Sequence, residues 1–148
     1  MPVDRSAWAY FDTSVLVKCY VAEHGTPEAV SLIGRHGVLS STLAPIELAS
    51  ALRSLEVRGG LTRRQRERAL ARFRADRSHW TLLLPDSSVL ARAEALVGTE
   101  PVKTLDALHL ASALVLQAEM NVRAPFITAD MQQCRAAEAL GLEVVFVG

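Results

Sequence analysis

The chain has 148 residues, half of them apolar, and its 16 basic side chains balance its 16 acidic ones. This length and composition suit a single domain over residues 1–148 with a sizeable buried core and no linker. No apolar run is long enough to cross a membrane, and the first residues lack the pattern of a signal peptide, so we expect a cytoplasmic protein without membrane attachment.

Five short apolar runs predict β-strands, and helical patterns fill most of the chain between them. The expected strands lie near residues 8–12, 38–41, 80–84, 126–128 and 143–147. Strands that alternate with helices are joined by right-handed crossovers. The sequence therefore predicts an α/β fold, in which a mostly parallel sheet of about five strands is flanked by helices on both faces.

Four polar residues stand where helices are expected to begin. Each can accept a hydrogen bond from the free backbone N–H groups of the first helical turn. These expected amino-terminal caps are Thr26, Thr62, Asp86 and Thr104.

Four acidic residues share one kind of local setting. Asp12 and Asp130 each follow a short apolar run and precede a helical stretch, so both are expected at the carboxyl ends of strands. Glu47 and Asp106 are expected in the first turns of helices, where the helix dipole favours an anion. In a parallel α/β sheet these positions share one edge, which is where such sheets place ligands. All four carboxylates can therefore meet there.

Clustered carboxylates point to a divalent metal. Two unit charges about 5 Å apart repel by roughly 3 kcal/mol at an effective dielectric near 20, so converging acids need a positive partner. Mg²⁺ and Mn²⁺ prefer oxygen ligands and keep several waters that further acids can orient. A bound metal can polarise a phosphoryl oxygen and help to form the attacking hydroxide. The acids therefore favour a nuclease that hydrolyses phosphodiester bonds over a binding module.

Each acid also has a purely structural interpretation. Asp12 and Asp130 could be only amino-terminal caps. Glu47 and Asp106 could merely favour their helix ends, an effect worth about 0.3–1 kcal/mol. The joint pattern, more than any single position, favours function.

Other conspicuous side chains are interpreted as structural. His109 lies one turn after the third acid, which invites a role as general base or metal ligand, but a histidine in an apolar helix is more often packed and hydrogen-bonded. Trp8 and Trp80 sit in or beside strands and are interpreted as core residues. Cys19 and Cys134 lack the paired spacing of a zinc site and are interpreted as buried, inert thiols.

Four segments carry a family resemblance: Tyr10 to Lys18, Pro45 to Leu52, Thr104 to Ala113, and Phe126 to Asp130. With these motifs the chain resembles the PIN-domain family, and especially the VapC-type toxin ribonucleases of bacterial type II toxin-antitoxin pairs. The resemblance covers essentially the whole chain and implies a three-layer PIN-like fold. One departure is Met131, which stands where relatives often carry a basic residue.

The resemblance also implies a site and a function. The family's catalytic, metal-binding acids and its two supporting hydroxyls map onto Asp12, Glu47, Asp106, Asp130, Ser14 and Thr128, in that order. The implied activity is that of an Mg²⁺- or Mn²⁺-dependent endoribonuclease that hydrolyses RNA. The implied partners are a second copy of the chain in a homodimer and a cognate antitoxin protein that inhibits it.

A strongly basic segment runs from residue 62 to residue 79. It carries seven arginines against two acids, a net charge of +5, so the rest of the chain is net −5. This asymmetry could provide phosphate contacts, and Arg63, Arg64 and Arg68 are the candidates for contact with RNA or a partner. The alternative is a solvated helix face whose buried stripe includes Phe73.

Two other classes of protein remain open. A phospho-acceptor receiver module also has acids at strand ends, but it needs paired acids after the first strand and a lysine after the last, and residues 144–148 contain no lysine. A non-catalytic scaffold could keep the fold and bind RNA or protein without cutting. Metal-dependent cleavage separates the enzyme from both.

Overall fold

The computed structural model describes residues 7–148, so the expectation that the first residues carry no signal peptide concerns a stretch outside this range. The elements are β1 (Trp8–Phe11), α1 (Thr13–Tyr20), α2 (Thr26–Arg35), β2 (Gly37–Ser41), α3 (Ala44–Val57), α4 (Arg63–Asp76), the 3-10 helix η2 (Arg77–His79), β3 (Thr81–Leu83), α5 (Ser87–Thr99), α6 (Thr104–Met120), β4 (Phe126–Thr128), α7 (Met131–Ala139) and β5 (Val144–Phe146). None of these helices is long and apolar enough to cross a membrane.

The five strands form one parallel sheet in the order β3-β2-β1-β4-β5. The predicted strands are confirmed, each within one residue at either end. Every connection between neighbouring strands passes through at least one helix, as parallel pairing requires. The predicted α/β fold with a parallel, helix-flanked sheet is therefore correct.

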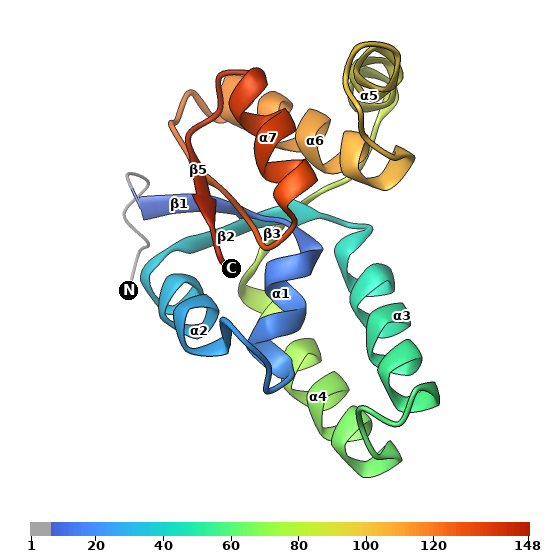
Figure 1. The fold of residues 1–148 in the computed structure, drawn as a ribbon. Helices are drawn as coiled ribbons and strands as arrows, with labels where there is room; N and C mark the ends of the chain where they lie inside the picture. The colour runs from blue at the N-terminus through green and yellow to red at the C-terminus, as the bar shows by residue number, and fades with distance from the viewer. Residues whose placement is uncertain (1–6) are drawn as a thin grey trace.

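Helices cover both faces of the sheet and form three layers (Figure 1). Helices α1 to α4 lie on one face and α5 to α7 on the other. In β1, Ala9 and Phe11 enter the first core and Tyr10 enters the second, all fully buried. Because both faces are covered, the strands have the apolar runs by which they can be predicted.

Two of the predicted helix caps are confirmed. The Thr62 hydroxyl accepts from the backbone N–H of Gln65 at 3.1 Å, and the Gln65 side chain accepts from the N–H of Thr62 at 2.8 Å, which completes a capping box at the start of α4. The Asp86 carboxylate accepts from the N–H groups of Ser88 and Val89, both at 3.1 Å, and starts α5.

The other two predicted caps are wrong, each by one residue. Helix α2 begins with Thr26 itself after Gly25, whose φ of 87° favours glycine, and the Thr26 hydroxyl donates to the carbonyl of Val21 instead. Helix α6 begins with Thr104 after Lys103 and has no side-chain cap. In neither helix does the side chain of the preceding residue accept a hydrogen bond from the first turn.

The interpretation of the tryptophans and cysteines as structural is confirmed. Trp80 packs, half-buried, against the first core and Trp8 against the second. Cys19 and Cys134 are buried free thiols.

Candidate active site

The sheet has its topological switch point between β1 and β4, because the chain crosses from β1 to β2 on one side while β4 and β5 lie on the other. Asp12 directly follows β1, and Asp130 lies two residues beyond the end of β4. The N–H of Asp12 donates to the carbonyl of Ile127 at 3.0 Å, so the two strand ends are in register. Open parallel sheets bind ligands at such a point.

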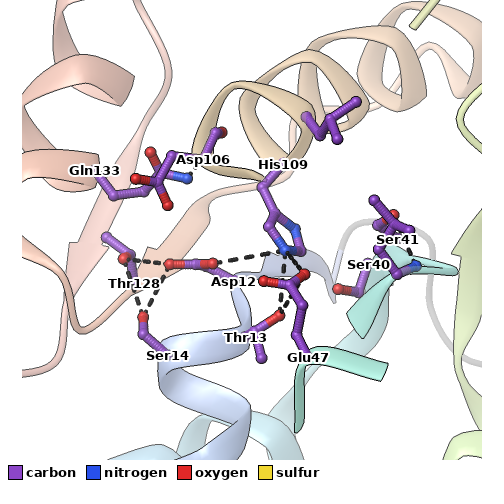
Figure 2. Close-up of polar contacts among 12 residues, drawn as sticks. Asp12, Thr13, Ser14, Ser40, Ser41, Glu47, Asp106, His109, Thr128 and Gln133 are labelled. Atoms are coloured by element: carbon purple, nitrogen blue, oxygen red, sulfur yellow. Dashed lines mark hydrogen bonds and ion pairs between the residues drawn. The ribbon is translucent and has the colours of Figure 1, made fainter. Parts of the chain in front are cut away.

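Asp12 lies at the centre of the site (Figure 2) and is only 4% exposed. It occupies the N-cap position of α1, but its side chain makes no capping hydrogen bond. Its Oδ2 instead accepts from the hydroxyls of Ser14 at 2.9 Å and Thr128 at 2.8 Å. The interpretation of Asp12 as a simple cap is therefore wrong, and both predicted hydroxyls contact it.

Glu47 lies in the first turn of α3, as predicted, in a helix that begins with Ala44 and carries Pro45 in its first turn. Its Oε1 lies 2.7 Å from Nε2 of His109 and accepts from the hydroxyl of Thr13 at 3.2 Å. Because an ionised carboxylate can only accept, the His109 Nε2 atom carries the proton of this hydrogen bond.

His109 is 1% exposed, and both of its ring nitrogens are in contact with polar groups. Nδ1 lies 2.8 Å from the Tyr10 hydroxyl, while Nε2 also lies 3.9 Å from Oδ1 of Asp12. Burial by itself lowers the pKa of His109, but the hydrogen bond to Glu47 and the charge of Asp12 outweigh it, so the pKa is raised. The packed, hydrogen-bonded interpretation is confirmed, and one of the hydrogen-bond partners is a candidate acid.

Asp106 is half-buried in the first turn of α6, as predicted. Burial raises its pKa most, and the negative charges of Asp12 and Asp130 raise it further. Asp12 and Asp130 therefore both act electrostatically on Asp106. The backbone of Asp106 is tied to α7, because the amide of the fully buried Gln133 side chain donates to its carbonyl at 3.0 Å.

Asp130 does cap α7, as its structural interpretation predicted. Its Oδ1 accepts from the N–H groups of Gln132 at 2.8 Å and Gln133 at 3.2 Å. Met131, the departure from the family pattern, begins α7 beside this acid with its side chain exposed.

Three of the acids share one arrangement, in which fixed donors bind one carboxylate oxygen. The bound atoms are Oδ2 of Asp12, Oε1 of Glu47 and Oδ1 of Asp130. Within residues 7–148 the second oxygen of each accepts no hydrogen bond. Each carboxylate is thus held in place and still has a free oxygen to offer a ligand.

The donor set fits a hard divalent cation. Its atoms are carboxylate and hydroxyl oxygens, and the lysine and arginine ion pairs of the described residues involve none of the four acids. In the same part of the chain, no three His, Cys, Asp or Glu side chains stand close enough to enclose an ion together. Mg²⁺ does not need such an enclosure, because it is usually bound through one or two carboxylates and keeps several waters.

We expect the Asp106→Asn variant to be more stable than the wild type when both are free of metal at neutral pH. A raised carboxyl pKa contributes stability below the ordinary value of 3.8, and this stability is lost as the pH rises through the folded-state pKa. The neutral amide removes that penalty. Thermal unfolding in chelator should show a higher melting temperature for the variant at pH 7, with the difference shrinking toward pH 3.

The matched control for this experiment is Glu119→Gln, which neutralises an exposed acid on the same helix. It should leave the melting temperature unchanged at both pH values. A lower melting temperature for Asp106→Asn at pH 7 in chelator would contradict the expected repulsion.

The structure does not bring the candidate arginines to the acids. Arg63 donates to Glu67 at 3.0 Å, while Arg64 and Arg68 are exposed and form no ion pair among the described residues. Helix α4 packs against α1 and α3 on the first layer (Figure 1), where it contacts α1 near Tyr20. Asp12 precedes the opposite end of α1.

Three contacting residues, Tyr10, Thr13 and Gln133, were not predicted as part of the site. The pattern of β1 holds a signal for Tyr10, because alternation places it on the face that α6 covers. Thr13 directly follows an acid, and Gln133 lies one turn after another acid. The local signal for Gln133 is that a polar glutamine stands on the buried face of a helix.

The fold and the site together define an α/β protein with an acidic cluster at the switch point of a parallel sheet. The family profile described as PIN domain matches residues 9–139, so the chain belongs to the PIN-domain family. This membership removes the receiver module as an alternative. A search of the curated proteins found no match to the sequence.

Two solved structures have the same fold. A toxin-antitoxin complex from Klebsiella pneumoniae is similar with a TM-score of 0.65 and 17% identity, over 95% of this chain and 98% of that one. A member of the VapBC family of toxin-antitoxin systems, VapBC-5 from Mycobacterium tuberculosis, is similar with a TM-score of 0.56 and 18% identity, over 95% of this chain and 99% of that one.

Proposed function

We propose that the chain is a metal-dependent endoribonuclease that hydrolyses RNA phosphodiester bonds, and that it is the toxin of a toxin-antitoxin pair. One observation carries the proposal. Asp12 and Asp130 lie at the switch point of the sheet, and burial together with the charges of these two acids raises the pKa of the half-buried Asp106. A bound divalent cation would offset this negative charge. Membership in the PIN-domain family and the likeness to two structures of toxin-antitoxin systems support this function.

In this proposal four acids serve one site for Mg²⁺ or Mn²⁺, in which one or two carboxylates bind the ion directly and the others orient its waters: Asp12, Asp106, Asp130 and Glu47. A cation bound there would polarise a phosphoryl oxygen of RNA and help to form the attacking hydroxide. The negative charge of the four carboxylates disfavours approach of a bare phosphate, so RNA binds productively only when the cation is present.

The hydroxyls of Ser14 and Thr128 have a supporting role. Both donate to Oδ2 of Asp12 and fix the plane of its carboxylate, which leaves Oδ1 for the cation. Ser14 is itself held, because its oxygen accepts from the N–H of Ala129 at 2.9 Å. This network ties the end of β1 to the end of β4.

The direct test is cleavage of total cellular RNA by the purified protein with Mg²⁺, with Mn²⁺ and with chelator. The proposal expects cuts with either metal and none with chelator, and mapping the cuts names the target RNA. A non-catalytic PIN-like scaffold is the alternative function. Folded wild-type protein that binds RNA but leaves it intact with both metals would favour the scaffold.

We further propose that the antitoxin lays an extended segment with a basic residue across the four acids. A groove of ≈ 460 Å³ beside Glu47 offers that segment an apolar surface, since it is lined by Ile46, which is 69% exposed, and Leu105, which is 47% exposed. Affinity for the purified antitoxin should fall at least about tenfold in an Asp12→Asn, Asp106→Asn double variant. Unchanged affinity would contradict the proposed basic contact.

We propose that the protein acts in the cytoplasm as a homodimer. Exposed Leu90 and Val97 on α5 line an apolar groove of ≈ 200 Å³ that continues onto α6, a surface suited to a second copy. Sedimentation should give twice the mass of one 16.1 kDa chain, and a Leu90→Asp, Val97→Asp variant should sediment as a monomer.

A further inference from the structure

A buried imidazole links one candidate acid to the opposite layer of the fold. Glu47 begins α3, which covers one face of the sheet, whereas His109 lies on α6, which covers the other. Their side chains meet at the carboxyl edge with 2.7 Å between Nε2 and Oε1 (Figure 2).

The imidazole is held from behind by Tyr10. The Tyr10 hydroxyl lies 2.8 Å from Nδ1, and its ring meets the His109 ring edge-on with centroids 5.9 Å apart. On its other side the Tyr10 ring stacks on Phe126 at 5.4 Å. A tyrosine hydroxyl that donates to Nδ1 leaves the proton of a neutral imidazole on Nε2, where it points to the carboxylate.

The same contacts exclude His109 as a metal ligand. Tyr10 occupies one ring nitrogen and Glu47 the other, so neither nitrogen has a lone pair to give a metal. The ring is shielded from solvent as well. His109 therefore acts on the site through Nε2, which lies 2.7 Å from Oε1 of Glu47, 3.2 Å from the Thr13 hydroxyl and 3.9 Å from Oδ1 of Asp12.

For Glu47 the contact restricts a flexible side chain. Its three rotatable bonds would otherwise leave the carboxylate free to turn into solvent. Donors from His109 and Thr13 both bind Oε1, so the carboxylate is fixed by one oxygen and Oε2 remains free.

We infer that His109 is a positioning residue: clamped by Tyr10, it holds Glu47 in the orientation in which the free oxygen of Glu47 serves the divalent cation or its waters. The inference rests on the proposed metal site and goes beyond it, because it assigns a role to a residue outside the four acids. It makes the Tyr10–His109 pair a determinant of metal affinity.

The test measures Mn²⁺ binding to the purified protein without RNA, by titration calorimetry and by the paramagnetic signal of free Mn²⁺. His109→Leu puts an apolar side chain of similar size in place of the ring and removes the hydrogen-bond contacts to Tyr10, Thr13 and Glu47. It should raise the Mn²⁺ dissociation constant about 10- to 100-fold. His109→Gln retains a donor that can reach Glu47 and should restore most of the affinity, which a purely packing role would not predict.

A double-mutant cycle separates positioning from general damage. In a Glu47→Gln background, His109→Leu should change the dissociation constant by less than about threefold, because the carboxylate it positions is already gone. The matched control is His36→Leu, which removes a half-buried histidine bonded to the carbonyl of Leu32 on α2. It should leave Mn²⁺ affinity unchanged.

If His109→Leu does not fold, Tyr10→Phe decides the matter. It removes only the clamping hydroxyl and keeps the stacked ring, and it should raise the dissociation constant several-fold. If folded His109→Leu binds Mn²⁺ with wild-type affinity, the inference is wrong while the proposed metal site stands. If His109→Leu does not fold, wild-type affinity of Tyr10→Phe leads to the same conclusion. The inference is also wrong if His109→Leu raises the Mn²⁺ dissociation constant by the same factor in the wild type and in the Glu47→Gln background. Absence of Mn²⁺ binding by the wild type overturns the proposed metal site and this inference together.

Discussion

Asp12→Asn is expected to reduce RNA cleavage by more than about 100-fold while the protein remains folded. Loss of a residue that merely orients a metal ligand typically reduces affinity or activity 10- to 100-fold. Asp12 is a proposed ligand itself, so its loss should have a larger effect. It is buried at the switch point, its charge raises the pKa of Asp106, and its Oδ1 accepts no hydrogen bond from the described residues.

The fold should survive because the new amide can still accept from Ser14 and Thr128 through its oxygen. Removing the negative charge of Asp12 also relieves its repulsion of Asp106. Cleavage is measured as the rate of cutting of one mapped RNA site with Mn²⁺, and folding by circular dichroism and thermal unfolding. Glu119→Gln, the exposed acid on α6, is the control and should cut at the wild-type rate.

Mn²⁺ affinity measured on the same samples locates the loss. Weaker binding in Asp12→Asn, together with lost cleavage, identifies Asp12 as part of the metal site. A folded variant that retains more than a tenth of wild-type cleavage would rule out the central role assigned to Asp12.

The fold and the positions of the acids follow from local sequence patterns. Buried parallel strands require continuous apolar runs, and the residue that ends such a run lies at the ligand edge, which is how Asp12 and Asp130 could be placed. Glu47 and Asp106 could be placed because first-turn helix positions lie at that same edge. No contact between distant segments had to be known for these four predictions.

Side-chain partners could not be predicted in this way. The hydrogen bond between Glu47 and His109 depends on how α3 and α6 approach each other from opposite layers, and the sequence near either residue does not encode that approach. The prediction for Thr26 failed for a different reason, because Gly25 with its φ of 87° takes the N-cap position and the Thr26 hydroxyl donates to the carbonyl of Val21. Thr62 succeeded because its capping box is entirely local.

The second large effect is expected from the basic helix α4: Arg64→Glu with Arg68→Glu should weaken RNA binding about tenfold or more at low salt. Both side chains are exposed and form no ion pair in the described part of the chain. Their charges are therefore free to meet phosphates, whereas a paired arginine must first give up its partner.

Most other arginines of the segment already contact side chains of the protein itself. Arg63 pairs with Glu67 and Arg66 donates to Glu56 at 2.7 Å. Arg72 and Arg77 have their own contacts, because the guanidinium of each lies over an aromatic ring, 5.5 Å from the Tyr20 centroid and 5.6 Å from that of Phe73. The solvated-face interpretation therefore holds for part of this segment only.

The position of α4 is compatible with RNA that also enters the acidic site. Helix α1 begins beside Asp12 and ends at Tyr20, where α4 packs. Its 8 residues span about 12 Å at 1.5 Å per residue. RNA held at the acids would have to extend only a few nucleotides along this layer to meet Arg68, which borders a cavity shared with Tyr20.

The salt dependence of binding distinguishes phosphate contact from a change in structure. Each phosphate contact to single-stranded nucleic acid contributes about 0.7 to the slope of log affinity against log salt, so losing two contacts should make the slope shallower by about 1.4. Binding is measured with catalytically inactive Asp12→Asn protein across a salt series, so that the RNA stays intact. Arg92→Glu with Arg123→Glu, two exposed arginines outside α4, is the control with the same change in net charge. Equal slopes for the two double variants would show that only net charge matters and that Arg64 and Arg68 form no phosphate contact of their own.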